Sequence, residues 1–266
     1  MATGSLHVNR DIILATKRQH LKQQMHSIPA DAVLALAQMQ NRPRGFLNFS
    51  NERQDITLFA HISRHEVYDP VTSALHCLSN GAQAIAFFTD HSIYHNDLDD
   101  MLILARAIPQ IPVLYQNYTL NEYGVMAARA SDASGIVAYS SVIPSEELRK
   151  IIIMAQRWKM TSMVQVNNED ELAFALTLSP HVIAFGDHLL NNLRATVEDL
   201  VTIHHTLPSY VKICIMQTID TLDDLELVLR APVDAVIVNE RLLKQEHLAA
   251  DVRHLIQAAR DKRNAS

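Results

Sequence analysis

Eight short apolar runs rich in β-branched residues alternate with longer segments of helical periodicity along the chain. Successive runs start between 20 and 29 residues apart, and each gap is long enough to hold one helix. This repeat is typical of a parallel (βα)₈ barrel, an α/β fold also known as the TIM barrel. The predicted strands are Ile56–Ile62, Ala84–Thr89, Val113–Tyr115, Gly135–Tyr139, Ser162–Val166, Val182–Phe185, Val211–Ile215 and Ala235–Val238.

Two further helices are predicted before the first strand, at Val8–His26 and Ala30–Met39. Residues 41–54 contain proline and glycine and read as a connection. We therefore expect one domain overall, with a helical extension and connection over residues 1–54 and the barrel over residues 55–266.

Local signals mark several helix ends. Pro70 is placed to open a helix and Gly81 to close it. Asn168 is a suitable N-cap for the helix that follows the fifth strand, and Thr221 with Asp224 three residues later resembles a capping box.

The composition favours an ordinary globular protein and changes this picture little. The chain has 266 residues, 48% of them hydrophobic, and a formal net charge of −6. It contains no apolar run of membrane-span length, no signal-like start and no basic block, so we predict a cytoplasmic protein without a membrane or nucleic-acid partner. Cys77 and Cys214 lie in apolar surroundings and are predicted to be small buried side chains, neither a disulfide nor a nucleophile.

Glycine is scarce, which bears on ligand binding. The chain has 6 glycines, whereas average usage would give about nineteen. Loops that wrap phosphate need glycine for close backbone approach. No glycine follows the seventh or eighth strand, and Glu240 stands where a phosphate would otherwise bind. We therefore expect poor phosphate binding there.

In a barrel of this kind, chemistry takes place at the carboxyl ends of the strands, here called the mouth. The side chains predicted there are mostly amides, hydroxyls and histidines, with no lysine. Amides donate and accept hydrogen bonds but do not exchange protons near neutral pH. The predicted ligand-binding residues are Ser63, Arg64, Gln116, Asn117, Gln165, Asn167, Gln217, Asn239 and Glu240.

Several segments resemble indole-3-glycerol phosphate synthase, the tryptophan-pathway enzyme with a (βα)₈ barrel and an N-terminal helical extension. The resemblance runs from about Asp11 to Ile256. It is carried by DIILATKRQHL, HEVYDP, FFTDHSIYHNDLDDM, IPVLYQNYTLNEYGV, VIPSEELRKIIIMAQRWKM and MVQVNNEDEL.

The departures from this family fall on its chemistry. By the resemblance, Gln116 replaces the general-acid lysine of the third strand and Gln165 the proton-transfer glutamate of the fifth. The family's glutamate and lysine of the first strand are matched by His61 and Ser63. Its motif after strand six falls on Gly186 and His188, and its ESG motif after strand seven falls on Met216–Thr218. Its phosphate turn after strand eight falls on Asn239–Arg241. The family's reaction closes an indole ring with loss of CO₂ and water, which requires proton transfers.

The sequence therefore favours a non-catalytic, pseudoenzyme barrel without cofactor or metal, which binds a partner protein or an uncharged polar molecule. One alternative is an enzyme of lyase or isomerase type that uses His61, Asp187 and His188 as catalytic residues. A weaker alternative is residual carboxy-lyase activity. His91 and His95 with Asp90 would suit a metal by spacing alone, an interpretation that we do not favour.

A surface for a protein partner is predicted on the helix that follows the fourth strand. If Leu148, Ile152, Ala155 and Lys159 define its core stripe, Ile153 falls on the solvent side. An exposed isoleucine can mark an interface, and the sequence leaves both a monomer and a homodimer open.

Overall fold

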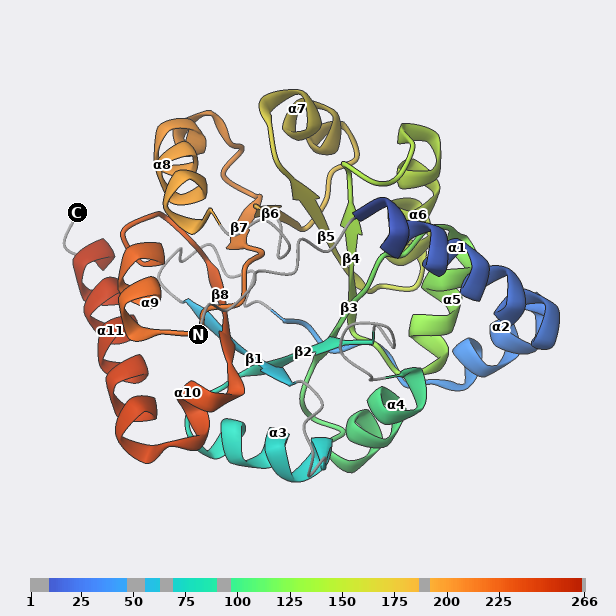
Figure 1. Ribbon diagram of the computed structural model, residues 1–266, viewed down its shortest axis with the longest axis horizontal. Helices are drawn as coiled ribbons and strands as arrows, with labels where there is room; N and C mark the ends of the chain where they lie inside the picture. Colours follow the sequence, from blue (N-terminus) through green and yellow to red (C-terminus); the bar gives the residue numbers. More distant parts are fainter. Residues whose placement is uncertain (1–9, 47–55, 63–68, 90–96, 187–191, 265–266) are drawn as a thin grey trace, which may run out of the picture.

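The computed structural model describes residues 10–46, 56–62, 69–89, 97–186 and 192–264. Eight parallel strands form a closed barrel in the order β1 to β8, with helices around it (Figure 1). Every predicted strand is present, with ends that differ by at most one residue. The strands are β1 Thr57–Ile62, β2 Ala84–Phe88, β3 Val113–Gln116, β4 Gly135–Tyr139, β5 Thr161–Val166, β6 Val182–Phe185, β7 Lys212–Ile215 and β8 Ala235–Asn239.

The predicted caps are also found. Pro70 is the first residue of α3, behind an Asp69 side chain that accepts from the backbone N–H groups of Val71 and Thr72. Asn168 caps α7 and Thr221 caps α9. The helices are α1 Arg10–Ser27, α2 Ala30–Met39, α3 Pro70–Ser79, α4 Leu98–Ala107, α5 Glu122–Ala130, α6 Ser145–Arg157, α7 Glu169–Thr177, α8 Leu193–Ile203, α9 Leu222–Val228, α10 Glu240–Lys244 and α11 Glu246–Asn264.

The strands read as nearly continuous apolar runs because both of their faces are buried. Alternate residues point inward, so Phe59, Leu114, Val137, Met163 and Cys214 share one cluster inside the barrel. The residues between them, such as Leu58 and Val164, belong to the layer between the strands and the helices. This alternation decides which side chains at the strand ends can reach the mouth.

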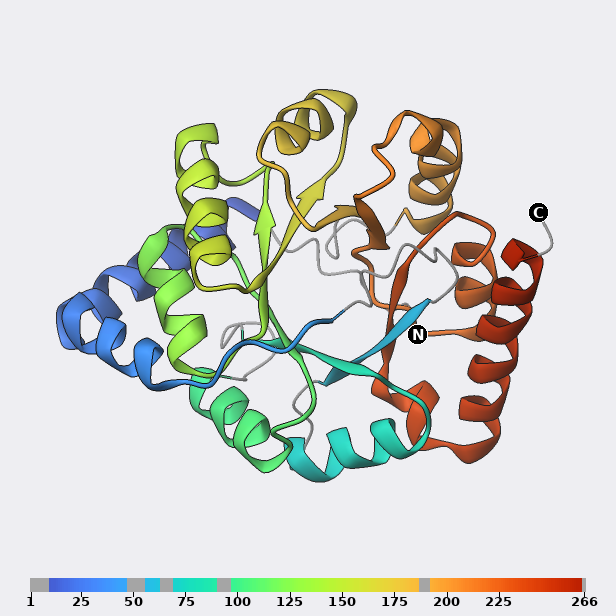
Figure 2. The ribbon, with the colours of Figure 1, turned by 180° about the vertical axis from the view of Figure 1, so that it is seen from behind.

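The N-terminal helices lie outside the ring, with α2 beside α5 (Figures 1 and 2). Phe46 then enters the interior cluster and stacks on Phe59 with ring centroids 5.5 Å apart. A Cβ at Gly135 would collide with the Phe46 ring and lie 2.7 Å from the Thr161 carbonyl oxygen. Phe46 therefore closes the amino-terminal end of the barrel, and Gly135 makes room for it.

A buried ion-pair cluster joins the connection to the barrel. Arg129 is 1% exposed, lies 3.1 Å from Asp132 and also donates to the carbonyls of Ala133 and Asn41. Arg44 contacts the other carboxylate oxygen of Asp132 at 3.2 Å. Burial lowers the pKa of the Arg129 guanidinium, while the neighbouring carboxylate opposes that shift.

The predicted orientation of α6 is confirmed at Ile153, which is 42% exposed, while Leu148, Ile152 and Ala155 are buried. Lys159 was wrongly placed in the core stripe. The helix ends at Arg157, and Lys159 follows with an exposed side chain and a φ of 58°.

Both cysteines are buried and free, as predicted. Burial raises the pKa of the Cys77 thiol and of the Cys214 thiol to about 12. Within the residues described, no helix has the length and apolar character needed to cross a membrane.

Candidate functional site

The last inward-facing residues of the strands form the floor of the mouth. Each of them lies two residues after a member of the interior cluster, and side chains two apart share one face of a strand. By this register the floor is made by His61, Phe88, Gln116, Tyr139, Gln165 and Met216, which follow Phe59, Ala86, Leu114, Val137, Met163 and Cys214.

Gln116 is the most unusual residue of this floor. Its side chain is fully buried, and neither Nε2 nor Oε1 has a hydrogen-bond partner among the described residues. Leaving a buried polar group unpaired costs about 1–3 kcal/mol. The amide thus offers an unused NH₂ group, with two donor hydrogens, and an unused acceptor oxygen at the end of β3.

Gln165 is held in a fixed orientation on the other side of the floor. Its Nε2 donates to Asn167 Oδ1 at 2.8 Å and to the Gly186 carbonyl at 2.7 Å. Its buried Oε1 accepts no hydrogen bond within the described chain. The end of β5 therefore presents a preorganised acceptor, and Asn167 serves to position it.

His61 lies at the end of β1 and is 5% exposed. Its ring packs edge-on against Phe88 with centroids 4.7 Å apart, and its Nδ1 lies 3.5 Å from Thr218 Oγ1. The other two candidate catalytic residues, Asp187 and His188, lie outside the described residues. A catalytic group formed by His61, Asp187 and His188 therefore stays a prediction.

Ser63, Arg64, Asp90, His91 and His95 also lie outside the described residues. Across the described ranges, no three His, Cys, Asp or Glu side chains gather closely enough to hold a metal ion.

Asn117 has a local structural role. Its Nδ2 donates to Thr89 Oγ1 at 2.9 Å, and its Oδ1 accepts from the backbone N–H of Tyr118. These bonds tie the ends of β2 and β3 together.

Gln217, another predicted ligand-binding residue, follows β7 and is 7% exposed.

The structure corrects the placement of Glu240. Its side chain is 1% exposed and pairs with Lys244 at 2.7 Å, and Lys244 in turn donates to Ser73 Oγ on α3. β8 ends at Asn239, and Glu240 is the first residue of α10, where its side chain lies with Lys244 beside α3. Glu240 is therefore not part of the mouth.

A different carboxylate lies at the end of β8. Asp220 Oδ1 accepts from Asn239 Nδ2 at 2.8 Å, and Asn239 Oδ1 accepts from the backbone N–H of Arg241 at 3.0 Å. The first turn of α10 is thus capped by the protein's own amide beside a negative charge. An N–H group used in this way is not available to a phosphate.

Two tyrosines that the sequence reasoning missed also lie at the mouth. Tyr118 and Tyr139 belong to the interior cluster, and their ring centroids are 4.7 Å apart. Tyr139 follows the inward-facing Val137 by two residues, so strand alternation alone could have identified it. The two rings add an apolar wall next to the two glutamines.

The chain matches the family model described as indole-3-glycerol phosphate synthase over residues 10–255. It is 24% identical over 265 residues to the indole-3-glycerol phosphate synthase of Dichelobacter nodosus, which covers 94% of this chain and 98% of the relative. The corresponding protein of Roseiflexus sp. is 27% identical over 258 residues, or 91% of this chain and 96% of the relative.

Similar solved structures include a thiamine phosphate pyrophosphorylase from Pyrococcus furiosus, with 16% identity and a TM-score of 0.54 over 78% of this chain and 98% of that one. A 4-hydroxy-2-oxoglutarate aldolase gives 16% identity and a TM-score of 0.56, over 86% and 97% of the two chains. These similarities bear on the fold alone. The match over nearly the whole chain shows that this protein belongs to the indole-3-glycerol phosphate synthase family, which is a family of carboxy-lyases.

Proposed function

We propose that this chain is a non-catalytic member of its family whose mouth binds an uncharged polar small molecule through Gln116 and Gln165. The observation that carries the proposal is the pair of buried carboxamides at the ends of β3 and β5. Both side chains are 0% exposed, and Gln116 Nε2, Gln116 Oε1 and Gln165 Oε1 have no protein partner in the described chain.

The loss of catalysis follows from the chemistry of the carboxamide group. Closing an indole ring with loss of CO₂ and water requires groups that donate and remove protons, and an amide does neither near neutral pH. By the family resemblance, the two glutamines occupy the positions of the general-acid lysine and the proton-transfer glutamate.

The same groups define the ligand that the mouth would accept. The NH₂ group of Gln116 and the two carboxamide oxygens carry no net charge, so they complement a neutral molecule that has both acceptor and donor groups. The Tyr118 and Tyr139 rings would cover its apolar part. The carboxylate of Asp220 and the capped turn of α10 disfavour a phosphate group.

Complementation of a tryptophan auxotroph that lacks the synthase tests the proposal in cells. We expect no growth without tryptophan when this chain is expressed as a soluble protein. The gene for the Dichelobacter nodosus relative, expressed to the same level, serves as the positive control. Growth supported by this chain would contradict the proposal.

A further inference from the structure

The N-terminal helix α2 presents an apolar face to solvent. One side of the helix is covered, because Val33 packs with Tyr123 and Ala127 of α5. On another side, Leu36 is 49% exposed and Met39 is 79% exposed. Figures 1 and 2 show α2 at the outer edge of the molecule, beyond α5. The helix therefore has one face on the barrel and an apolar face without cover.

The exposed apolar residues form one stripe along α2. Ala32, Ala35, Leu36 and Met39 are all exposed, and spacings of three and four residues place them on one face of a helix. Ile28, which is 42% exposed, precedes Ala32 by four residues. Single exposed apolar residues are common on monomeric proteins, whereas a contiguous apolar patch marks an interaction surface.

α2 is fastened to the barrel at both of its ends, so the stripe has a fixed orientation. Tyr123 OH donates to the Ile28 carbonyl at 3.0 Å just before the helix. Gln40 Nε2 donates to the Ala130 carbonyl at 2.8 Å just after it. A helix that is already ordered loses little conformational freedom when a partner binds. The stripe can therefore dock without refolding.

The sizes of the side chains in the stripe fit a second copy of the same helix that runs antiparallel. About a two-fold axis between residues 35 and 36, Ala35 of each copy faces Leu36 of the other, and Ala32 faces Met39. Each large side chain then lies opposite a small one, which allows two helices to approach closely. In a parallel pair, Leu36 would face Leu36 and Met39 would face Met39.

The charges at the two ends of α2 also favour an antiparallel second copy. Asp31 in the first turn and Arg42, three residues past the end of the helix, are both exposed. The next cation, Arg44, is held by Asp132 at 3.2 Å. Antiparallel pairing brings Asp31 of each copy toward Arg42 of the other, whereas a parallel pair would bring like charges together.

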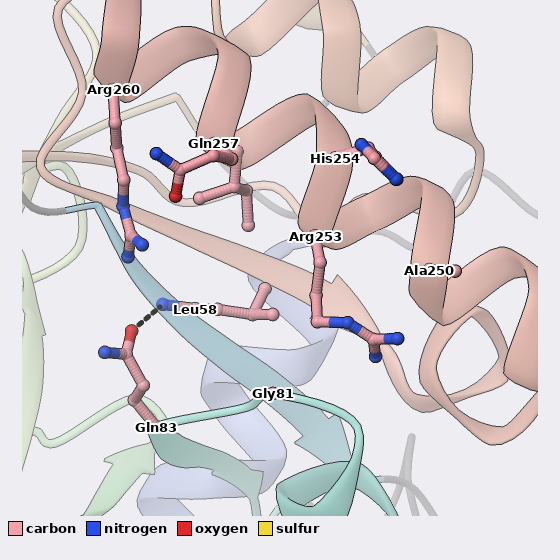
Figure 3. Close-up of a pocket in the computed structure, with 9 residues that line it drawn as sticks. Leu58, Gly81, Gln83, Ala250, Arg253, His254, Gln257 and Arg260 are labelled. Carbon is pink, nitrogen blue, oxygen red and sulfur yellow. Dashed lines mark hydrogen bonds between the residues drawn. The ribbon is translucent and has the colours of Figure 1, made fainter.

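A recess between α11 and β1, at the amino-terminal end of the barrel, offers a second copy much less (Figure 3). Its apolar lining residues Leu58 and Ile256 are buried. Several of its polar groups are bonded within the chain: Gln83 Oε1 accepts from the Leu58 N–H at 3.1 Å, and Arg253 donates to the Asn80 carbonyl at 2.9 Å. Unlike α2, this recess therefore has little apolar surface for a partner to cover.

We propose that two copies of this chain associate through α2 as an antiparallel helix pair centred on Ala35 and Leu36. The interface covers Ile28, Leu36 and Met39 of both copies and brings Asp31 beside Arg42 at each end. A contact centred on one ten-residue helix is small beside the roughly 800 Å² per partner of a standard interface. The dimer is therefore weak, with an expected dissociation constant of about 10–100 µM.

Sedimentation velocity of the full chain between about 5 and 200 µM tests this proposal. We expect the average sedimentation coefficient to rise with concentration toward that of a dimer. Leu36→Asp should weaken association at least tenfold. Ile103→Asp is the matched control, because Ile103 on α4 is 57% exposed and lies outside the proposed interface. It should associate like the unmodified protein.

Three results would overturn the proposal. They are a monomer at every concentration, a dimer that Leu36→Asp leaves intact, and a dimer that Ile153→Asp on α6 dissociates while Leu36→Asp does not.

Ala35→Leu separates the proposed register from nonspecific apolar association. The substitution adds apolar surface at an exposed position, but it fills the space that Leu36 of the other copy would occupy. We expect it to weaken the dimer at least tenfold. Stronger association of Ala35→Leu would contradict the proposed register, because nonspecific association increases with apolar surface.

Charge reversal tests the antiparallel orientation. Asp31→Arg and Arg42→Asp each place like charges at both ends of the helix pair and should each weaken association at least threefold. The double variant restores both pairs with their signs exchanged and should associate within about twofold of the unmodified protein. A double variant as weak as the single variants would contradict the proposal. None of these substitutions touches the mouth, so this proposal and the proposed function can fail independently.

Discussion

At the scale of single residues, the proposed ligand site depends most on the buried amide of Gln116, whose polar atoms have no partner among the described residues. A leucine of similar size would fill the same space without unpaired polar atoms. We expect Gln116→Leu to raise the free energy of unfolding by about 1–3 kcal/mol, measured by urea denaturation of the free protein.

Gln156 provides the matched control for this substitution. Its Nε2 donates to the Leu178 and Ser179 carbonyls, so Gln156→Leu should bring no gain in stability. A loss of stability in Gln116→Leu would mean that its amide is paired in the free protein, and the argument for a neutral ligand would lose its basis.

His181 gives the protein a pH-dependent stability outside the mouth. Its Nδ1 accepts from the backbone N–H of Ser162 at 3.1 Å, and burial lowers the pKa of the imidazole. The unfolded chain takes up a proton near pH 6.5, whereas the folded chain does so only at lower pH. This contribution to stability is therefore complete above pH 6.5 and is lost as the pH falls toward the folded pKa.

The measurement is the free energy of unfolding between pH 7.5 and pH 5.5. One extra proton bound by the unfolded state gives a slope of up to about 1.4 kcal/mol per pH unit. His181→Gln keeps an acceptor for the Ser162 N–H. Below pH 6.5, the free energy of unfolding of this variant should depend less steeply on pH than that of the unmodified protein. Identical pH profiles for the two proteins would show that His181 does not contribute.

Strand alternation predicts from sequence which strand-end residues face inward, as it does for His61, Gln116 and Gln165. It does not reveal how side chains pair across loops. Glu240 opens α10 and pairs with Lys244 on the same helix, whereas the carboxylate beside Asn239 comes from Asp220, 19 residues away in the chain. The Asp220–Asn239 contact depends on the three-dimensional course of a loop, which residue patterns do not encode.

At the scale of secondary-structure elements, the attachment of the N-terminal segment depends on Asp132. Asn at this position tolerates the observed φ of 62°, so Asp132→Asn removes the charge with little backbone cost. The substitution leaves the buried Arg129 without its carboxylate, so we expect the free energy of unfolding to fall by about 3–5 kcal/mol. Chemical denaturation measures the loss.

Glu147→Gln is the control for the Asp132 substitution. The Glu147–Lys150 pair on α6 is largely solvent-exposed, so breaking it should change stability by less than about 1 kcal/mol. Equal losses of stability in the two variants would show that the buried Arg129–Asp132 pair does not stabilise the attachment of the N-terminal segment to the barrel.

The strands and helix caps could be predicted closely because their signals are local. Asn168 and Thr221 each cap their helix with their own side chain, and Pro70 opens α3. The closure of the barrel by Phe46 was not predicted, because it joins Phe46 to Gly135 across 89 positions and no local pattern records that contact. The exposed Ile153 was predicted, and its role as an interface stays a prediction.

For the whole molecule, the family fold is retained while the floor of the mouth carries amides and aromatic rings. After β8, Asn239 bonds to Asp220 and caps α10, and the amino-terminal end of the barrel is closed by Phe46. The barrel is thus intact as a scaffold, and the proposed change of function is confined to a few side chains at the strand ends.

The most direct test of this account is a single-turnover assay with purified protein in excess over the carboxyphenylamino-deoxyribulose phosphate precursor, measuring formation of indole-3-glycerol phosphate. The account predicts no conversion above that seen with Gln116→Leu, while the Dichelobacter nodosus relative converts the precursor under the same conditions. Conversion by this chain that is abolished in Gln116→Leu or Gln165→Leu would contradict it.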